Sequence, residues 1–106
     1  MFGIDVGYTF RRRIPPVVNH TTATERAAMA AQTVCGAKVV TNFPPSTAGD
    51  DFAFFAENAP GAYVWLGNGP AVDGALHHNT AYDFNDEAIE TGVAFWVALV
   101  EQELRA

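Results

Sequence analysis

The chain has 106 residues and a formal net charge of −6, with 12 acidic against 6 basic side chains. This length suits one small domain. The acidic balance argues against a nucleic-acid partner, because phosphate contacts need lysine and arginine. No apolar run approaches the roughly 20 residues that a membrane-spanning helix needs, so no membrane partner is expected. The single cysteine, Cys35, excludes an internal disulfide and favours a reducing cytoplasm.

The first stretch of the chain alternates apolar and polar side chains. A strict period of two over residues 3–12 predicts a strand with one buried face. Pro15 and Pro16 end it, because proline has no amide hydrogen to donate to a neighbouring strand. This pair is the best candidate for a domain boundary, and Asn19 after it is expected to be structural. The apolar members of the alternation are Ile4, Val6, Tyr8 and Phe10.

Two helices are expected in the first half of the chain. Thr22 and Glu25 fit the pattern of a capping box. The alanine-rich run behind it predicts a helix over residues 23–34, with Gly36 as its C-terminal cap. A second, shorter helix starts at residues 49–52, because carboxylates are favoured in the first turn of a helix.

The last predicted helix covers residues 86–104 and is capped by Asn85 or Asp86. Its apolar residues recur at spacings of three and four, which predicts a buried stripe along one face. The stripe consists of Ile89, Val93, Trp96, Val97, Val100 and Leu104.

Two short strands complete the prediction. Residues 38–40 are a strand candidate, and residues 62–66 are apolar throughout, as in a strand of a parallel sheet covered on both faces. The glycine-rich loop at residues 67–74 lacks the pattern of a phosphate-binding loop. After the proline pair, the order helix, strand, helix, strand, helix indicates an α/β fold.

The sequence contains no local catalytic set: G-x-S-x-G, H-E-x-x-H and C-x-x-C are all absent. A metal hypothesis remains, because His77 and His78 precede the last helix and neutral imidazole is a good zinc ligand. Adjacent side chains on an extended segment point apart, so both are not expected to bind one ion. Surface or packing histidines are the alternative.

Several stretches carry a family resemblance: residues 15–19 (PPVVN), 49–52 (GDDF), 60–69 (PGAYVWLGNG), 78–79 (HN) and 82–86 (YDFND). Together they resemble the C-terminal part of the hippurate hydrolase family, metal-dependent N-acyl-amino-acid amidohydrolases related to zinc exopeptidases. The resemblance runs almost from end to end. It implies that residues 17–106 are the C-terminal portion of a helix–sheet–helix metallopeptidase-type catalytic domain. Residues 1–16 would be the last strand of an inserted lid domain, with the hinge.

The resemblance also implies site residues. The family's histidine lies four positions before its tyrosine, which selects His78 as the metal ligand, and the implied metal is zinc, nickel or manganese. His77 stands where the family usually has an apolar residue. Asp50 and Asp51 are candidates to line the site or to orient its ligands, although carboxylates at a helix start explain them equally well. The sequence departs from the family's pattern at Asp50, Thr80 and Glu90, which replace a glutamate and two prolines.

The intact enzyme implied by this resemblance hydrolyses the amide bond of a small N-acyl amino acid. Water attacks with metal assistance and a glutamate moves the proton. The family's Cys-x-His ligand pair, Glu-Glu pair and further histidine are absent from this sequence. We therefore expect no catalytic residue here, no metal or partial occupancy, and no activity in the isolated chain. Whether the chain alone is an enzyme is left open.

Two alternatives stand beside this interpretation. The first is a non-catalytic α/β module that self-associates. The second is a small active enzyme whose site forms between subunits from His20, His77, His78 and Asp50. On the favoured interpretation, missing neighbours would leave apolar surface exposed, and the chain is expected to self-associate through strand edges.

Overall fold

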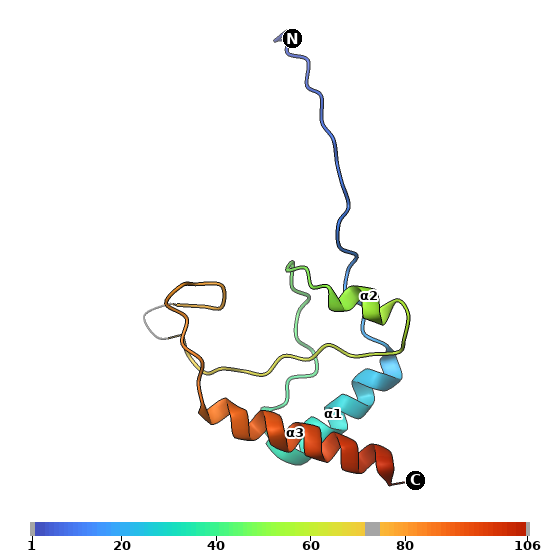
Figure 1. Cartoon of the computed structure of the whole chain (residues 1–106), viewed down its shortest axis with the longest axis vertical. Helices are drawn as coiled ribbons and strands as arrows, with labels where there is room; N and C mark the ends of the chain where they lie inside the picture. Colours follow the sequence, from blue (N-terminus) through green and yellow to red (C-terminus); the bar gives the residue numbers. More distant parts are fainter. Residues whose placement is uncertain (1, 72–74, 106) are drawn as a thin grey trace.

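The structure is a computed structural model that describes residues 2–71 and 75–105. Long irregular segments connect the helices within these ranges (Figure 1). The elements in chain order are α1 (Thr21–Cys35), the 3-10 turn η1 (Gly36–Lys38), α2 (Phe52–Ala56) and α3 (Glu87–Leu104). None of these described helices is long and apolar enough to cross a membrane. The final residues of the predicted loop at 67–74 lie outside the described ranges.

The predicted α/β fold is wrong, because the described residues contain no strand. A strand requires a ladder of backbone hydrogen bonds to a second strand. Residues 3–12, 38–40 and 62–66 have no such neighbour. They form extended or irregular chain instead, except Lys38, which belongs to η1. The helix–sheet–helix domain and the lid strand are therefore not present in this structure. The division at residues 16 and 17 stays a prediction.

Helix α1 ends as predicted but begins differently. Its first turn has no side-chain cap; the Thr24 hydroxyl instead donates a hydrogen bond to the carbonyl of His20 over 3.0 Å. The predicted capping box is therefore wrong. At the other end, the amide of Gly36 donates to the carbonyl of Gln32, and its φ of 54° is a conformation that glycine adopts without strain.

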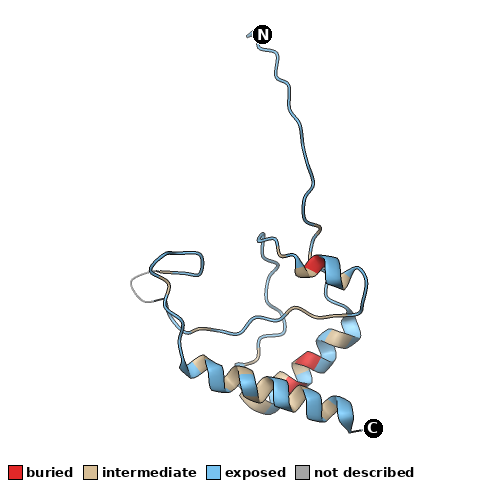
Figure 2. Ribbon diagram, in the orientation of Figure 1, coloured by how far each residue is buried: buried red, intermediate tan, exposed pale blue. Residues whose placement is uncertain are grey.

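The helices α1 and α3 pack against each other. Small side chains allow the close approach, since Ala27 and Ala30 of α1 are 7% and 1% exposed (Figure 2). The prediction that the apolar stripe of α3 is buried is wrong, because its six residues are 52–78% exposed. A different face of α3 is half-buried instead. It consists of Ala88, Thr91, Gly92, Ala94, Phe95, Ala98, Leu99 and Gln102.

Side-chain hydrogen bonds attach the segment after the proline pair to residues 61–63. The Asn19 amide donates to the carbonyl of Tyr63 over 2.9 Å and accepts from the Tyr63 backbone amide over 2.8 Å. The amide of His20 donates to the carbonyl of Gly61 over 2.9 Å. A side chain at Gly61 would meet the Phe52 ring at 3.0 Å, so the chain passes close to α2 here. Asn19 is structural, as predicted.

The chain exposes far more surface than its size requires. Its accessible surface is 9500 Å², against about 5,800 Å² for a compact protein of this mass. Its radius of gyration is 18.8 Å, against about 13 Å for a compact domain. The buried apolar residues in the described ranges are Ala27, Ala30 and Ala53. The predicted exposure of apolar surface is confirmed.

Candidate functional site

The two adjacent histidines lie in a tight turn before α3. The amide of Asn79 donates to the carbonyl of Leu76 over 3.0 Å, which closes the turn around His77 and His78. His78 has a φ of 70°. A side chain in this left-handed region carries a strain of roughly 1–3 kcal/mol, and such strain clusters at functional sites. His78 is the one non-glycine residue with positive φ in the described ranges.

The chain that follows is held by its own side chains. The Asn79 side-chain oxygen accepts the amide hydrogen of Ala81 over 2.8 Å, and the Asn79 carbonyl accepts the amide hydrogen of Tyr82 over 3.0 Å. The rings of Tyr82 and Phe84 then meet edge to face, with 4.8 Å between centroids. The histidine turn is thus continuous with an ordered run of turns that leads into α3.

A side chain from the glycine-rich loop ties this region together. The Asn68 amide donates to the carbonyl of Asp83 over 3.2 Å, and the Asn68 side-chain oxygen accepts the Asn85 amide hydrogen over 2.9 Å. The Asn85 side chain accepts the amide hydrogen of Glu87 over 3.1 Å and so caps α3. Of the two predicted caps, Asn85 is the one that uses its side chain. Asn68 had no predicted role; the feature that could have indicated one is an asparagine flanked by two glycines, Gly67 and Gly69.

Aromatic rings connect the histidine turn to the extended segment at residues 62–66. The Trp65 and His77 ring centroids are 6.0 Å apart, and those of His77 and His78 are 4.9 Å apart. The Tyr63 and Trp65 ring centroids are also 6.0 Å apart. The expectation that the two histidines point apart assumed an extended segment. The turn places their rings side by side instead.

An open cavity of about 720 Å³ adjoins this turn. His77, Trp65 and Tyr82 are among its lining residues, and polar groups from Asn68 and Asp83 share the wall. His78 does not line it, and neither do Asp50 and Asp51. The structure therefore brings the two histidines together but keeps both aspartates away from this cavity.

Both carboxylate oxygens of Asp50 accept hydrogen bonds at the start of α2. One carboxylate oxygen accepts the Phe52 amide hydrogen over 2.8 Å, and the other accepts the Tyr63 hydroxyl over 3.0 Å. That hydrogen bond raises the pKa of Tyr63, and burial and the negative charges of Asp50 and Asp51 add to the effect. The roles of Asp50 and Asp51 toward a ligand stay predictions.

The donor groups present do not fit a complete metal site. Within the described residues, no three histidine, cysteine, aspartate or glutamate side chains are grouped so that they could hold an ion. A catalytic zinc takes about three protein ligands and a water. His77 and His78 offer two neighbouring rings at most, so the assignment of His78 as a ligand stays a prediction.

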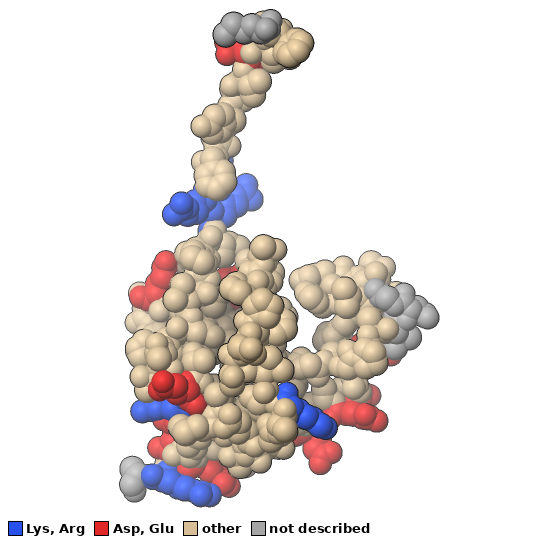
Figure 3. Space-filling model, turned by 180° about the vertical axis from the view of Figure 1, so that it is seen from behind, with Lys and Arg blue, Asp and Glu red and all other residues tan. Residues whose placement is uncertain are grey.

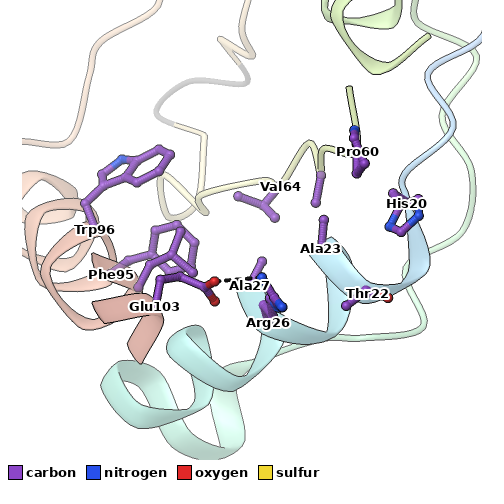
Figure 4. Close-up of a pocket in the computed structure, with 12 residues that line it drawn as sticks. His20, Thr22, Ala23, Arg26, Ala27, Pro60, Val64, Phe95, Trp96 and Glu103 are labelled. Atoms are coloured by element: carbon purple, nitrogen blue, oxygen red, sulfur yellow. Dashed lines mark hydrogen bonds and ion pairs between the residues drawn. The ribbon is translucent and has the colours of Figure 1, made fainter. Parts of the chain in front are cut away.

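A second cavity of about 490 Å³ lies between α1, α3 and residues 60–64 (Figure 4). Phe95 and Trp96 form part of its apolar wall. Arg26 and Glu103 form an ion pair across it, with 2.7 Å between nitrogen and oxygen. His20 lines this cavity, whereas His77 lines the other one. A site built from both, as in the intersubunit interpretation, is not assembled within one chain.

Comparison with known families identifies the chain. Residues 4–102 match Peptidase family M20/M25/M40, and the chain belongs to this family. This agrees with the family resemblance seen in the sequence, although nothing in the comparison singles out hippurate hydrolase.

Three similar proteins illustrate the range of relatives. The putative amidohydrolase YhaA of Bacillus subtilis is 30% identical over 86% of this chain and 24% of its own length. The IAA-amino acid hydrolase ILR1-like 2 of Arabidopsis thaliana is 26% identical over 90% of this chain and 22% of its own length. A putative glutamate–cysteine ligase of Rhodococcus jostii is 31% identical over 90% of this chain and 12% of its own length. The chain thus spans about a quarter or less of these relatives, and no solved structure matches it significantly.

Proposed function

We propose that this chain is a segment of a metal-dependent amidohydrolase that cleaves the amide bond of small N-acyl amino acids. The observation that supports this most is the family match over residues 4–102. Two relatives bear the names of an amidohydrolase and of an amino-acid-conjugate hydrolase. Hippurate-like N-acyl amino acids belong to this proposed substrate class.

His78 is the residue that we propose as the metal ligand of this segment. Its neutral imidazole is a suitable donor for zinc, nickel or manganese. The left-handed backbone at His78 fixes the ring on a turn closed by Asn79 and Leu76. The contact between His77 and Trp65 gives the neighbouring residue a positioning role instead. This assignment follows the family's spacing and is supported by the strained turn.

We expect the isolated chain to be inactive. The metal supplies the activated water in this chemistry, and a glutamate base moves its proton. The described residues lack a three-donor group, and the sequence lacks the family's paired glutamates. The chain's own contribution is to hold one imidazole in place. Its lone cysteine and net negative charge are compatible with a cytoplasmic protein that does not bind nucleic acid.

Elemental analysis of the purified chain, with hydrolysis of an N-acyl amino acid measured in parallel, tests this. The expected result is well below one metal ion per chain and no hydrolysis above the buffer rate. One bound ion per chain together with turnover would contradict the proposal, because it would require a complete site within copies of this chain.

The alternative is a non-catalytic module that self-associates and binds no metal. Its supporting observation is the exposure of large apolar side chains, with Trp65 and Trp96 58% and 63% exposed, since large uncovered apolar areas mark interaction sites. The effect of the His78→Ala substitution on metal affinity separates the two proposals. The ligand proposal predicts a loss that His77→Ala does not reproduce, and the alternative predicts no effect from either substitution.

A further inference from the structure

Asn68 is the one asparagine of this chain that is followed by a glycine. The backbone nitrogen after an asparagine can attack the side-chain carbonyl carbon, and a side chain on that next residue hinders the approach. Glycine has no side chain and the most adaptable backbone, so an Asn-Gly pair reacts most readily. The residues that follow the other asparagines all carry side chains: His20, Phe43, Ala59, Thr80 and Asp86.

We propose that Asn68 is a site of spontaneous deamidation, and that the fold slows the reaction by holding the Asn68 side chain away from its own backbone. The Gly69 nitrogen bonds to Cγ of Asn68, and the bond from Cγ to Nδ2 breaks, so that ammonia leaves with the amide hydrogen of Gly69. Water then opens the cyclic imide at either carbonyl, which gives aspartate or isoaspartate. The net reaction consumes one water and releases one ammonia. This inference does not depend on the proposed hydrolase function.

Both polar ends of the Asn68 side chain are bonded to a segment further along the chain. Nδ2 donates to the carbonyl of Asp83 over 3.2 Å, and the side-chain oxygen accepts the amide hydrogen of Asn85 over 2.9 Å. We call these two hydrogen bonds the Asn68 clamp. Ring closure requires the half-buried side chain to leave both partners and turn onto the Gly69 nitrogen. The reaction therefore proceeds from a locally opened state, and its rate falls with the population of that state.

Conversion of Asn68 removes one of the two bonds of the clamp. An ionised carboxylate accepts hydrogen bonds but donates none, so an oxygen in place of Nδ2 would face the carbonyl oxygen of Asp83. Isoaspartate also moves the carboxylate, because its backbone runs through the former side chain and is one carbon longer. Both products thus lose the geometry that connects residue 68 to residues 83–85.

Nearby charge does not offset this loss. Residues 67–86 include three aspartates and no lysine or arginine. Figure 3 shows no basic side chain on the visible face of the lobe that this stretch forms at the right of the view. An ion pair within the stretch therefore cannot replace the lost bond. Because Asn85 caps α3 and the turns before it lead back to His78, deamidation is a slow, irreversible step that loosens the segment between the histidine turn and α3.

Mass spectrometry of the aged chain tests the site and its protection. The Ala59→Gly variant supplies a matched control, because it creates a second Asn-Gly pair at Asn58, whose side chain makes one local bond to the carbonyl of Phe54. In urea the two sites should react at similar rates. In the folded chain Asn68 should react at least about tenfold more slowly than in urea, as expected for the loss of two hydrogen bonds, and Asn58 should be slowed less. Equal rates for Asn68 in both conditions would overturn the proposal.

Amide hydrogen exchange measured by NMR tests the consequence. Asn68→Asp imitates one product and should speed exchange of the Asn85 amide hydrogen by about tenfold, since the clamp no longer holds. Asn79→Asp is the matched control, because the Asn79 side-chain oxygen accepts the Ala81 amide hydrogen and a carboxylate keeps that role. Exchange at Ala81 should therefore not increase in this control. Unchanged exchange at Asn85 in Asn68→Asp would contradict the opening of the clamp.

Discussion

The two apolar faces of α3 differ in what lies against them. One face packs on α1 and is half-buried, with Phe95 and Leu99 among its members. The other carries Val93, Trp96 and Val97 and is more than half exposed. Apolar spacing of three and four identifies a helix, but a helix that is apolar on two faces does not reveal which one its neighbour covers.

The largest expected effect comes from placing a larger side chain in the contact between α1 and α3. Ala30 is 1% exposed where α1 meets α3, so Ala30→Leu should destabilise the chain by about 1–3 kcal/mol through overpacking. The measurement is the thermal midpoint by circular dichroism. Met29→Leu, on an exposed position of the same helix, is the control and should change stability by less than about 0.5 kcal/mol. Equal effects would mean that the helices do not pack as described.

The next largest effect is expected from the hydrogen bonds that attach residues 61–63 to Asn19. Asn19→Ala removes both hydrogen bonds to the Tyr63 backbone and should cost about 1–2 kcal/mol in unfolding free energy. Denaturant titration measures it. Asn58→Ala is the comparison, because Asn58 makes a single side-chain bond to the carbonyl of Phe54; its cost should be smaller. The reverse order would contradict the structural role of Asn19.

A smaller effect should appear with pH. The hydrogen bond to Asp50 raises the pKa of Tyr63 in the folded chain, so stability from this contact is present below the unfolded tyrosine pKa of about 10. It is lost as the pH rises above that value, because the unfolded chain ionises more readily. Tyr63→Phe should remove this part of the alkaline loss in a titration of the thermal midpoint. An unchanged alkaline profile would argue against the contact.

The smallest effect is expected on the uncovered face of α3. Val97 is 52% exposed, so Val97→Gln should change the unfolding free energy by no more than about 0.5 kcal/mol in the dilute chain. Leu99→Ala on the covered face should cost more, and the same denaturant titrations compare them. A larger effect at Val97 would show that this face is covered in solution.

Local signals predicted the helices well. Gly36 ends α1 as predicted, and α3 covers nearly the predicted residues, with Asn85 supplying the cap. These features depend on residues within a few positions of each other. The strands were wrong because a ladder depends on a distant partner. The capping box at Thr22 was wrong because α1 starts at Thr21, two residues before the predicted start, and Thr22 therefore lies inside the helix.

Part of the candidate site was also predictable, because that part depends on residues that are neighbours in the sequence. The sequence singled out His77 and His78, and the structure places their rings together in one turn. The positive φ of His78, its neighbour's contact with Trp65 and the bridge made by Asn68 depend on the folded loop. No local sequence pattern predicted these three features. Asp50 matched a family position, but its hydrogen bonds to Tyr63 and Phe52 became visible in the fold alone.

The most direct test of the proposed ligand is a chimera in which residues 17–106 replace the matching segment of the Bacillus subtilis relative. If His78 is a ligand, the chimera should bind metal, and His78→Ala should lower its metal affinity by at least about 10- to 100-fold, the range seen for weaker outer-shell changes. His77→Ala should leave most of the affinity intact. A chimera whose metal content is unchanged by His78→Ala, or lost through His77→Ala instead, would contradict the account.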